Sequence, residues 1–162
     1  CSSEDALRRA SPAVGDLLST PRQCEPDVSP RLPECLRPRS RFALQLAGRG
    51  VRGQLHRGSC AWCGWQALAC GRQRWRLLPP DFDAEALAAS LGDLGCGASP
   101  RDLFAAGAET LEPLEAVLGP GDVLVTPCGW WSQALAEAPS LAVASQYVTT
   151  ASLPHVCRAV LA

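Results

Sequence analysis

The chain has 162 residues, the length of one domain, and with 47% hydrophobic and 19% charged residues it can bury an ordinary core. No run approaches the ~18 apolar residues of a membrane span, so we expect no transmembrane segment and leave only peripheral membrane association open. The net charge of −1 hides a split: residues 1–80 hold 13 Arg against 6 acids, and residues 81–162 hold 2 Arg against 10 acids. We expect these halves to neutralise each other within one fold rather than to form a face that binds nucleic acid.

Residues 1–41 are expected to form a Pro-rich N-terminal arm without long regular elements. Ser11 and Pro12 are typical of a short helix start, but proline then recurs at short intervals. These prolines are Pro21, Pro26, Pro30, Pro33 and Pro38. Because proline removes a backbone donor and restricts φ, such an arm must pack either on its own domain or on a partner.

From residue 42 onward, short apolar runs separated by glycine and proline predict β-strands. The predicted strands cover residues 42–47, 65–70, 74–78, 114–118, 123–126 and 141–147. Gly71 is expected to end the second strand, and Pro79 with Pro80 the third. The Gly119–Asp122 segment is expected to form a turn between two of the later strands.

Helical patterns interrupt these strands at residues 83–109. Asp83 is a helix cap before apolar residues at helical spacing, and Ser99 followed by Pro100 is typical of a second helix start. Helical spacing after Leu153 predicts a short C-terminal helix within residues 151–162. Strands before and after a helical insert favour one mainly β sandwich or jelly roll over residues 42–150.

Two segments resemble a known family. Residues 71–80 read GRQRWRLLPP, and residues 119–132 read GPGDVLVTPCGWWS. They are similar to two motifs of Jumonji-C (JmjC) domains, and His56 and Gly58 fall where that family carries a His-x-Asp motif. The order and spacing agree over residues 42–147. The resemblance implies a cupin fold, which is a double-stranded β-helix or jelly roll, here with short helices.

The same resemblance implies an oxygenase site from which this chain departs. Active JmjC domains hold Fe(II) with two His and one carboxylate, and a basic residue pairs with the co-substrate 2-oxoglutarate. His56 matches the first His, whereas Gly58 stands at the carboxylate, Ser132 at the second His and Gln73 at the basic residue. Because these replacements supply no strong iron ligand and no charge, we expect a non-catalytic domain with no cofactor and no catalytic residue.

Cysteine chemistry offers an alternative at the same place. His56, Cys60, Cys63 and Cys128 are residue types that zinc binds, and a jelly roll should bring the segments of His56 and Ser132 side by side. A rebuilt site would make the chain a zinc-binding module or a metal-dependent cupin enzyme that resembles the 2-oxoglutarate oxygenases. Disulfides, a redox-active Cys60–Cys63 pair and unreactive buried thiols also remain open for the nine cysteines.

The five tryptophans have a structural interpretation as well. Trp75, Trp130 and Trp131 fall at family-like positions and are expected to pack in the sandwich or at its rim. Trp62 and Trp65 flank Cys63 and are expected to cover the vacated pocket. A third class of function, a small-ligand module, would leave that pocket roomy, apolar and free of metal.

Together these observations favour a structural or protein-interaction subunit of a larger assembly. The arm, the charge split and the surplus tryptophan suit contacts with other protein subunits, and no nucleic acid is expected. A start at Cys1 and a sequence without Met are typical of a chain whose targeting segment has been removed. This favours an organelle: a plastid, a mitochondrion or a lumenal compartment.

Overall fold

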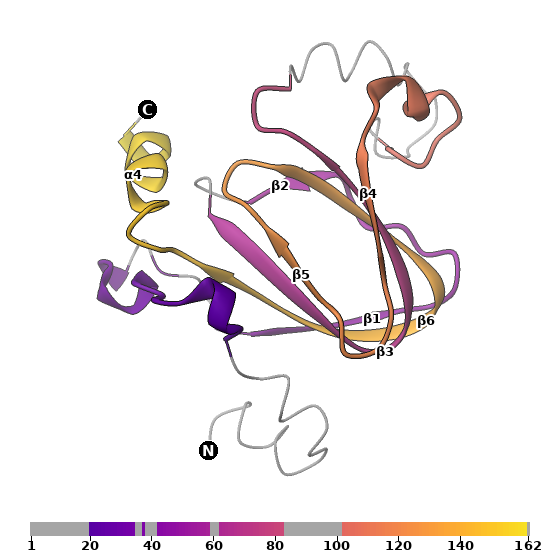
Figure 1. Cartoon of the computed structure of the whole chain (residues 1–162), viewed down its shortest axis with the longest axis horizontal. Helices are drawn as coiled ribbons and strands as arrows, with labels where there is room; N and C mark the ends of the chain where they lie inside the picture. Colours follow the sequence, from indigo (N-terminus) through magenta and orange to yellow (C-terminus); the bar gives the residue numbers. More distant parts are fainter. Residues whose placement is uncertain (1–19, 35–36, 38–41, 59–61, 83–101, 162) are drawn as a thin grey trace.

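The computed structural model describes residues 20–34, 37, 42–58, 62–82 and 102–161, and the elements below belong to these residues (Figure 1). The strands are β1 (Ala43–Ala47), β2 (His56–Arg57), β3 (Cys63–Leu78), β4 (Leu114–Leu118), β5 (Val123–Thr126) and β6 (Trp131–Tyr147). The helical elements are the 3₁₀ turns η1 (Arg22–Cys24), η2 (Ser29–Arg31) and η5 (Ala108–Leu111) and the helix α4 (Leu153–Leu161). None of these helices is long and apolar enough to cross a membrane.

The two long strands β3 and β6 organise the sheet. They pair antiparallel from Cys63 opposite Tyr147 to Leu78 opposite Trp131. β1 and β5 flank one half of this pair, whereas β2 and β4 flank the other half. Each long strand therefore contributes to two four-stranded layers, and Figure 1 shows both strands curving between them. This arrangement confirms the predicted mainly β, cupin-like jelly roll.

The two layers face each other across an apolar core. Its buried members come from both halves of the sheet and are Leu68, Trp75, Leu77, Leu118 and Ala142. A second buried cluster lies on the opposite face of β3, where Trp65 and Cys63 pack with Tyr147. Alternate residues of one strand thus supply two cores, as the period of two in a β-strand requires.

The bend of β3 lies at Gly71, where the sequence predicted the end of a strand. That prediction was wrong, because residues 65–70 and 74–78 belong to one continuous strand. The pairing with β6 is irregular between Leu68 and Gln73, and Gly71 has φ +92°. A Cβ at Gly71 would lie 2.2 Å from the carbonyl oxygen of Pro139, so only glycine fits this close crossing.

β6 is also longer than predicted. The sequence placed a strand at residues 141–147, whereas β6 begins at Trp131. Its first half includes Gln133, Glu137 and Pro139, which interrupt a simple alternation of apolar and polar residues. Pairing with β3 on one side and β2 on the other stabilises this half, so the tertiary partners decide its structure.

The predicted helical insert is described only from residue 102. The helix expected to start at Asp83 lies outside the described residues. The helix expected to start at Ser99 does not continue through residues 102–107, which form turns, and η5 is a single 3₁₀ turn. A local hydrogen bond from the backbone N–H of Phe104 to Asp102 Oδ1 stabilises the turn instead of a helix.

The C-terminal helix was predicted correctly. α4 lies within residues 151–162, and its start is stabilised by reciprocal hydrogen bonds between Thr149 and Ser152. Its apolar face packs through Val156 against Trp62 and Val148.

The described part of the arm, residues 20–34, packs on its own domain. Cys24 is fully buried in the cluster of Trp65 and Tyr147. Asp27 fixes the next turn, because its carboxylate accepts hydrogen bonds from the backbone N–H groups of Ser29 and Val148, at 2.9 and 3.1 Å. The sheet thus provides the packing surface that these residues were predicted to need. The helix expected at Ser11 lies outside the described residues.

Among the described residues, arginines of the first half of the chain pair with acidic residues of the second half, as expected. On the outer face, Glu137 pairs with Arg72 and Arg74, at 2.8 and 2.7 Å, and Glu115 pairs with Arg74 and Arg76. The guanidinium groups hold the pKa of Glu137 below its usual value through hydrogen bonds. These Arg–Glu pairs join β3 to β6 and β4, but such exposed pairs contribute little stability each.

We predict that Gly71→Ala destabilises the domain by about 3 kcal/mol or more, because the added Cβ collides with the backbone of β6 in addition to the cost of a positive φ. Gly50→Ala is the matched control. Gly50 also has a positive φ, +81°, but a Cβ there meets no atom within 4 Å. Its expected cost is about 1 kcal/mol. Equal losses in chemical denaturation would contradict the crossing at Gly71.

Candidate functional site

The positions of the two family histidines lie opposite each other. His56 on β2 is the direct register partner of Ser132 on β6. Ser132 is 5% exposed, whereas His56 is exposed on the short outer strand. The Nδ1 atom of His56 lies 2.9 Å from the carbonyl oxygen of Gln54, which can only accept a hydrogen bond. In the neutral ring Nδ1 therefore carries the proton and Nε2 remains an acceptor.

The position of the family carboxylate has no room for a side chain. Gly58 follows β2, and a Cβ there would lie 2.7 Å from the carbonyl oxygen of Trp62. A carboxylate at this position would require the backbone itself to move. The backbone at Gly58 therefore leaves no space for a larger residue.

Gln73, at the position of the family's basic residue, belongs to a buried polar network. Its Oε1 accepts hydrogen bonds from Gln66 Nε2 and from Trp75 Nε1, and its Nε2 donates to Ser140 Oγ at 3.0 Å. Both Gln66 and Gln73 are buried. Gln73 therefore holds the bent strands together, and its acceptor oxygen is fully used within the protein.

These positions surround a cavity between the layers, of about 260 Å³. His56, Gly58 and Ser132 line it together with four of the five tryptophans, which are Trp62, Trp65, Trp75 and Trp130. A second cavity of about 470 Å³ shares the lining residues Gln45, His56 and Trp75 and reaches Gln73. The described lining of both contains no Asp, Glu, Lys or Arg.

Trp62 and Trp65 are both buried and lie along this pocket, but the Trp65 side chain packs with Cys24 and Tyr147 on the opposite face of β3. Trp75 and Trp130 pack against the inner core, as predicted. Trp131 points into a different cluster, with Leu78 and Leu103, and the Arg57 guanidinium lies over its ring. The lining by Trp75 and Trp130 was not predicted, because sequence spacing does not show which layer a strand joins.

The residues at this site do not fit Fe(II) and 2-oxoglutarate. Two histidines and a carboxylate are the ligand set for such iron, and the three corresponding positions offer one imidazole, a hydroxyl and a glycine. No Lys or Arg of the described lining can pair with the co-substrate's carboxylate, and Gln73 is bound to Gln66, Trp75 and Ser140.

The cysteines of the zinc hypothesis are only partly described. Cys60 lies outside the described residues. Cys63 and Cys128 interact with each other, and burial raises the pKa of the Cys63 thiol. Among the described residues no three His, Cys, Asp or Glu side chains gather as a metal would require, so His56 is not joined to these thiols. Cys63 lies in a strand, whereas the redox motif normally begins a helix.

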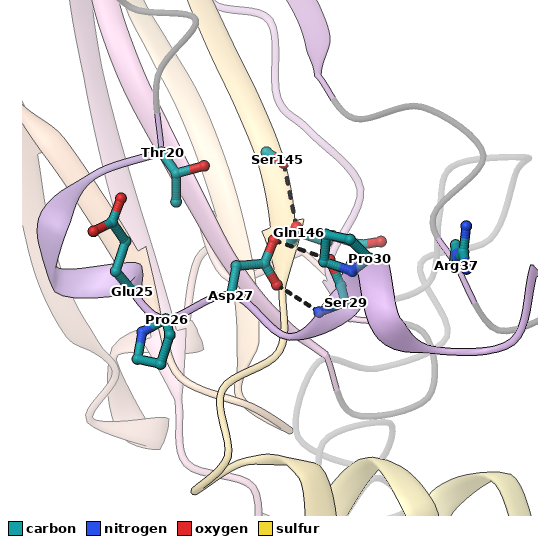
Figure 2. A pocket seen from close by; sticks show the side chains of 9 residues that line it. All are labelled: Thr20, Glu25, Pro26, Asp27, Ser29, Pro30, Arg37, Ser145 and Gln146. Atoms are coloured by element: carbon teal, nitrogen blue, oxygen red, sulfur yellow. Dashed lines mark hydrogen bonds between the residues drawn. The ribbon is translucent and has the colours of Figure 1, made fainter.

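A larger cavity of about 780 Å³ lies between the arm and β6, and the sequence analysis did not identify it. Figure 2 shows Asp27 directed towards Ser29 there, with Arg37 at the other end of the lining. Both carboxylate oxygens of Asp27 accept hydrogen bonds within the protein. This cavity therefore arises where the arm packs against β6. A proline-rich sequence does not show which strand the arm will contact.

Comparison with known proteins places this geometry in a class. No family model matches the chain. It is 29% identical over 102 residues to "Lysine-specific demethylase JMJ21" of Arabidopsis thaliana, covering 57% of this chain and 11% of that protein. It is 23% identical over 158 residues to "Bifunctional arginine demethylase and lysyl-hydroxylase psr-1" of Caenorhabditis briggsae, covering 91% of this chain and 40% of that protein.

The C. elegans protein of the same description is also 23% identical over 158 residues and is covered to 39%. The chain thus spans less than half the length of these relatives. Among solved structures, the Drosophila melanogaster CENP-C cupin domain is similar at 8% identity, with 67% of this chain and 62% of that chain covered and a TM-score of 0.43. The sequence matches show that the chain is similar to JmjC demethylases, and its jelly roll is the fold expected of such a domain.

We predict that Gln73→Lys, which restores the family's basic residue, destabilises the domain by about 2–4 kcal/mol. The ammonium cannot accept the hydrogen bonds of Gln66 and Trp75, and it buries a charge without a partner. Gln54→Lys makes the same chemical change at an exposed site and should alter the free energy of unfolding by less than about 0.5 kcal/mol. Equal stability of both variants would contradict the network.

Proposed function

We propose that this chain is a non-catalytic JmjC-like domain that acts as a structural or protein-interaction subunit of a larger assembly. The observation that carries the proposal is Gly58, because the carbonyl oxygen of Trp62 lies 2.7 Å from where a Cβ would be. An oxygenase of this class needs a carboxylate there, and this backbone accepts no side chain.

The other site positions support the same proposal. Ser132 lies opposite His56 and provides a hydroxyl, which is a weak iron ligand. Gln73 uses its side chain to connect β3 with Ser140 on β6. Gln73 thus stabilises the scaffold, whereas Gly58 and Ser132 supply no strong iron ligand. The demethylase and hydroxylase activities in the names of the relatives are therefore not proposed for this chain.

An interaction role is supported by the free edge at β1. β1 pairs with β6, and no described strand pairs with its other side. Leu46 on this strand is 82% exposed, and Leu44 and Val51 nearby are exposed too. Exposed apolar residues at an unpaired sheet edge are typical of surfaces that another chain covers.

The second candidate is a metal-dependent enzyme or zinc-binding module with a rebuilt site. The contact between Cys63 and Cys128 favours it, because these are two of its four proposed ligands. Stoichiometric zinc or iron in protein isolated from its source, without added metal, would favour this candidate over the non-catalytic one.

We predict that the chain does not bind 2-oxoglutarate in the presence of Mn(II), a stand-in for iron. Calorimetric titration should show a Kd above about 1 mM, because no carboxylate holds the metal and no cation pairs with the ligand. Ser132→His is the matched variant. This variant restores one histidine ligand but leaves glycine at the carboxylate position, so it should still not bind 2-oxoglutarate. Micromolar affinity in the unchanged chain would refute the non-catalytic proposal.

For the interaction role we predict that Leu46→Asp releases the chain from its assembly. In extracts of the source expressing a tagged chain, the variant should elute at the size of the free domain. Its free energy of unfolding should change by less than about 0.5 kcal/mol, since Leu46 is exposed. Val160→Asp on α4, another exposed apolar site, is the control and should stay in the assembly. Unchanged elution of Leu46→Asp would count against the β1 edge.

A further inference from the structure

We propose that the cavity between the two layers binds a compact, uncharged, polyhydroxylated ring such as a neutral monosaccharide. This inference concerns a ligand for the space that Ser132 and His56 border, and it does not depend on the interaction role proposed above. It rests on three features of the lining: its charge, its free hydrogen-bonding groups and its tryptophans.

The lining selects against ions. No Asp, Glu, Lys or Arg is among its described residues, and its one imidazole is held as a donor to the Gln54 carbonyl. An anion entering here would lose its hydration without gaining a cationic partner, and a cation would find no carboxylate. The acidic co-substrate of the family is disfavoured for the same reason.

The free polar groups suit hydroxyls. Ser132 and Thr126 offer hydroxyl groups, Gln146 offers its carboxamide and Gln66 its carboxamide oxygen, since Gln66 Nε2 already donates to Gln73. No hydrogen bond of these free groups is found among the described residues. Trp131 Nε1 is the one fully buried side-chain nitrogen or oxygen without a partner in the described part of the chain. The unpaired groups of Ser132, Thr126, Gln66 and Gln146 are therefore accessible within the cavity rather than sealed in the core.

The placement of these groups favours a saturated ring over a flat base. They lie in both layers: Gln66 on β3, Thr126 on β5 and Gln146 near the end of β6 belong to one layer, and Ser132 near the start of β6 belongs to the other. Hydroxyl and amide groups can each donate or accept, and so can the hydroxyls that radiate from a sugar ring. A planar base presents polar atoms only along its edge and would leave several of these groups unpaired.

The tryptophans supply the apolar side of the site. Trp62, Trp75 and Trp130 line the cavity, and indole faces pack against the C–H face of a sugar ring while hydroxyls reach polar partners. The volume of about 260 Å³ is just below the range of drug-sized pockets, so it suits a single ring rather than a chain of sugars.

Tryptophan emission provides the test, because four of the five tryptophans line the cavity. The full chain is titrated with glucose, galactose, mannose and myo-inositol, and in parallel with glucuronate, 2-oxoglutarate and adenine. At least one neutral ring should change the emission in a saturable way, and ligand-observed NMR should report the same affinity. The charged compounds should bind at least about tenfold more weakly, since the lining offers them no counter-charge.

Two variants locate the effect. Thr126→Val keeps the shape and removes one hydroxyl, so affinity should fall about three- to tenfold. Thr110→Val removes a hydroxyl from an exposed turn and should leave affinity unchanged. Ser132→Leu fills the cavity and should abolish binding, with thermal unfolding measured to establish that it folds.

The proposal fails if no neutral ring gives a saturable signal, or if adenine or an acidic compound binds more tightly than every neutral ring. It also fails if Thr126→Val binds as the unchanged chain does. If Ser132→Leu does not fold, the proposal is tested by comparing the affinities of Thr126→Val and Thr110→Val for the neutral ring.

Discussion

The close approach of the β3 and β6 backbones at Gly71 and Pro139 is the contact on which the architecture depends. Two strands of 16 and 17 residues pair along their whole length, and without a bend they would form one flat ribbon with a single buried face. The absence of a side chain at Gly71 lets the backbones approach, so each strand supplies two layers. The interior between the layers exists because of this bend.

The bend and the strand pairing also bring the family-like positions together around the space between the layers. The pairing of β2 with β6 places His56 opposite Ser132 through backbone hydrogen bonds, whichever side chains they carry. Gln73 and Gln66 then connect the strands through a polar network close to the bend. Gln73, which stands at the family's basic position, is bound within this network, and the described lining of the cavity contains no Asp, Glu, Lys or Arg.

Much of the fold was accessible from local patterns. β4, β5 and α4 match their predicted positions, because each is short and bounded by residues that end an element, such as the Gly119–Asp122 turn. The first half of β6 was not predicted, because its pattern is interrupted and its structure comes from its partners. Gly71 was interpreted as a strand end, since the sequence does not show that another backbone passes close by.

The amino-acid sequence by itself determined the class of the fold, the positions of the family-like segments and the identities of the residues at the family's ligand positions, because residue identity and spacing are local properties. Tertiary structure alone decided that Trp62 closes over Gly58, that Gln73 is bound to Gln66, and that four tryptophans meet around one space. These facts depend on contacts between residues distant in the chain. Such contacts are set by the register and bend of the long strands, and no local pattern encodes them.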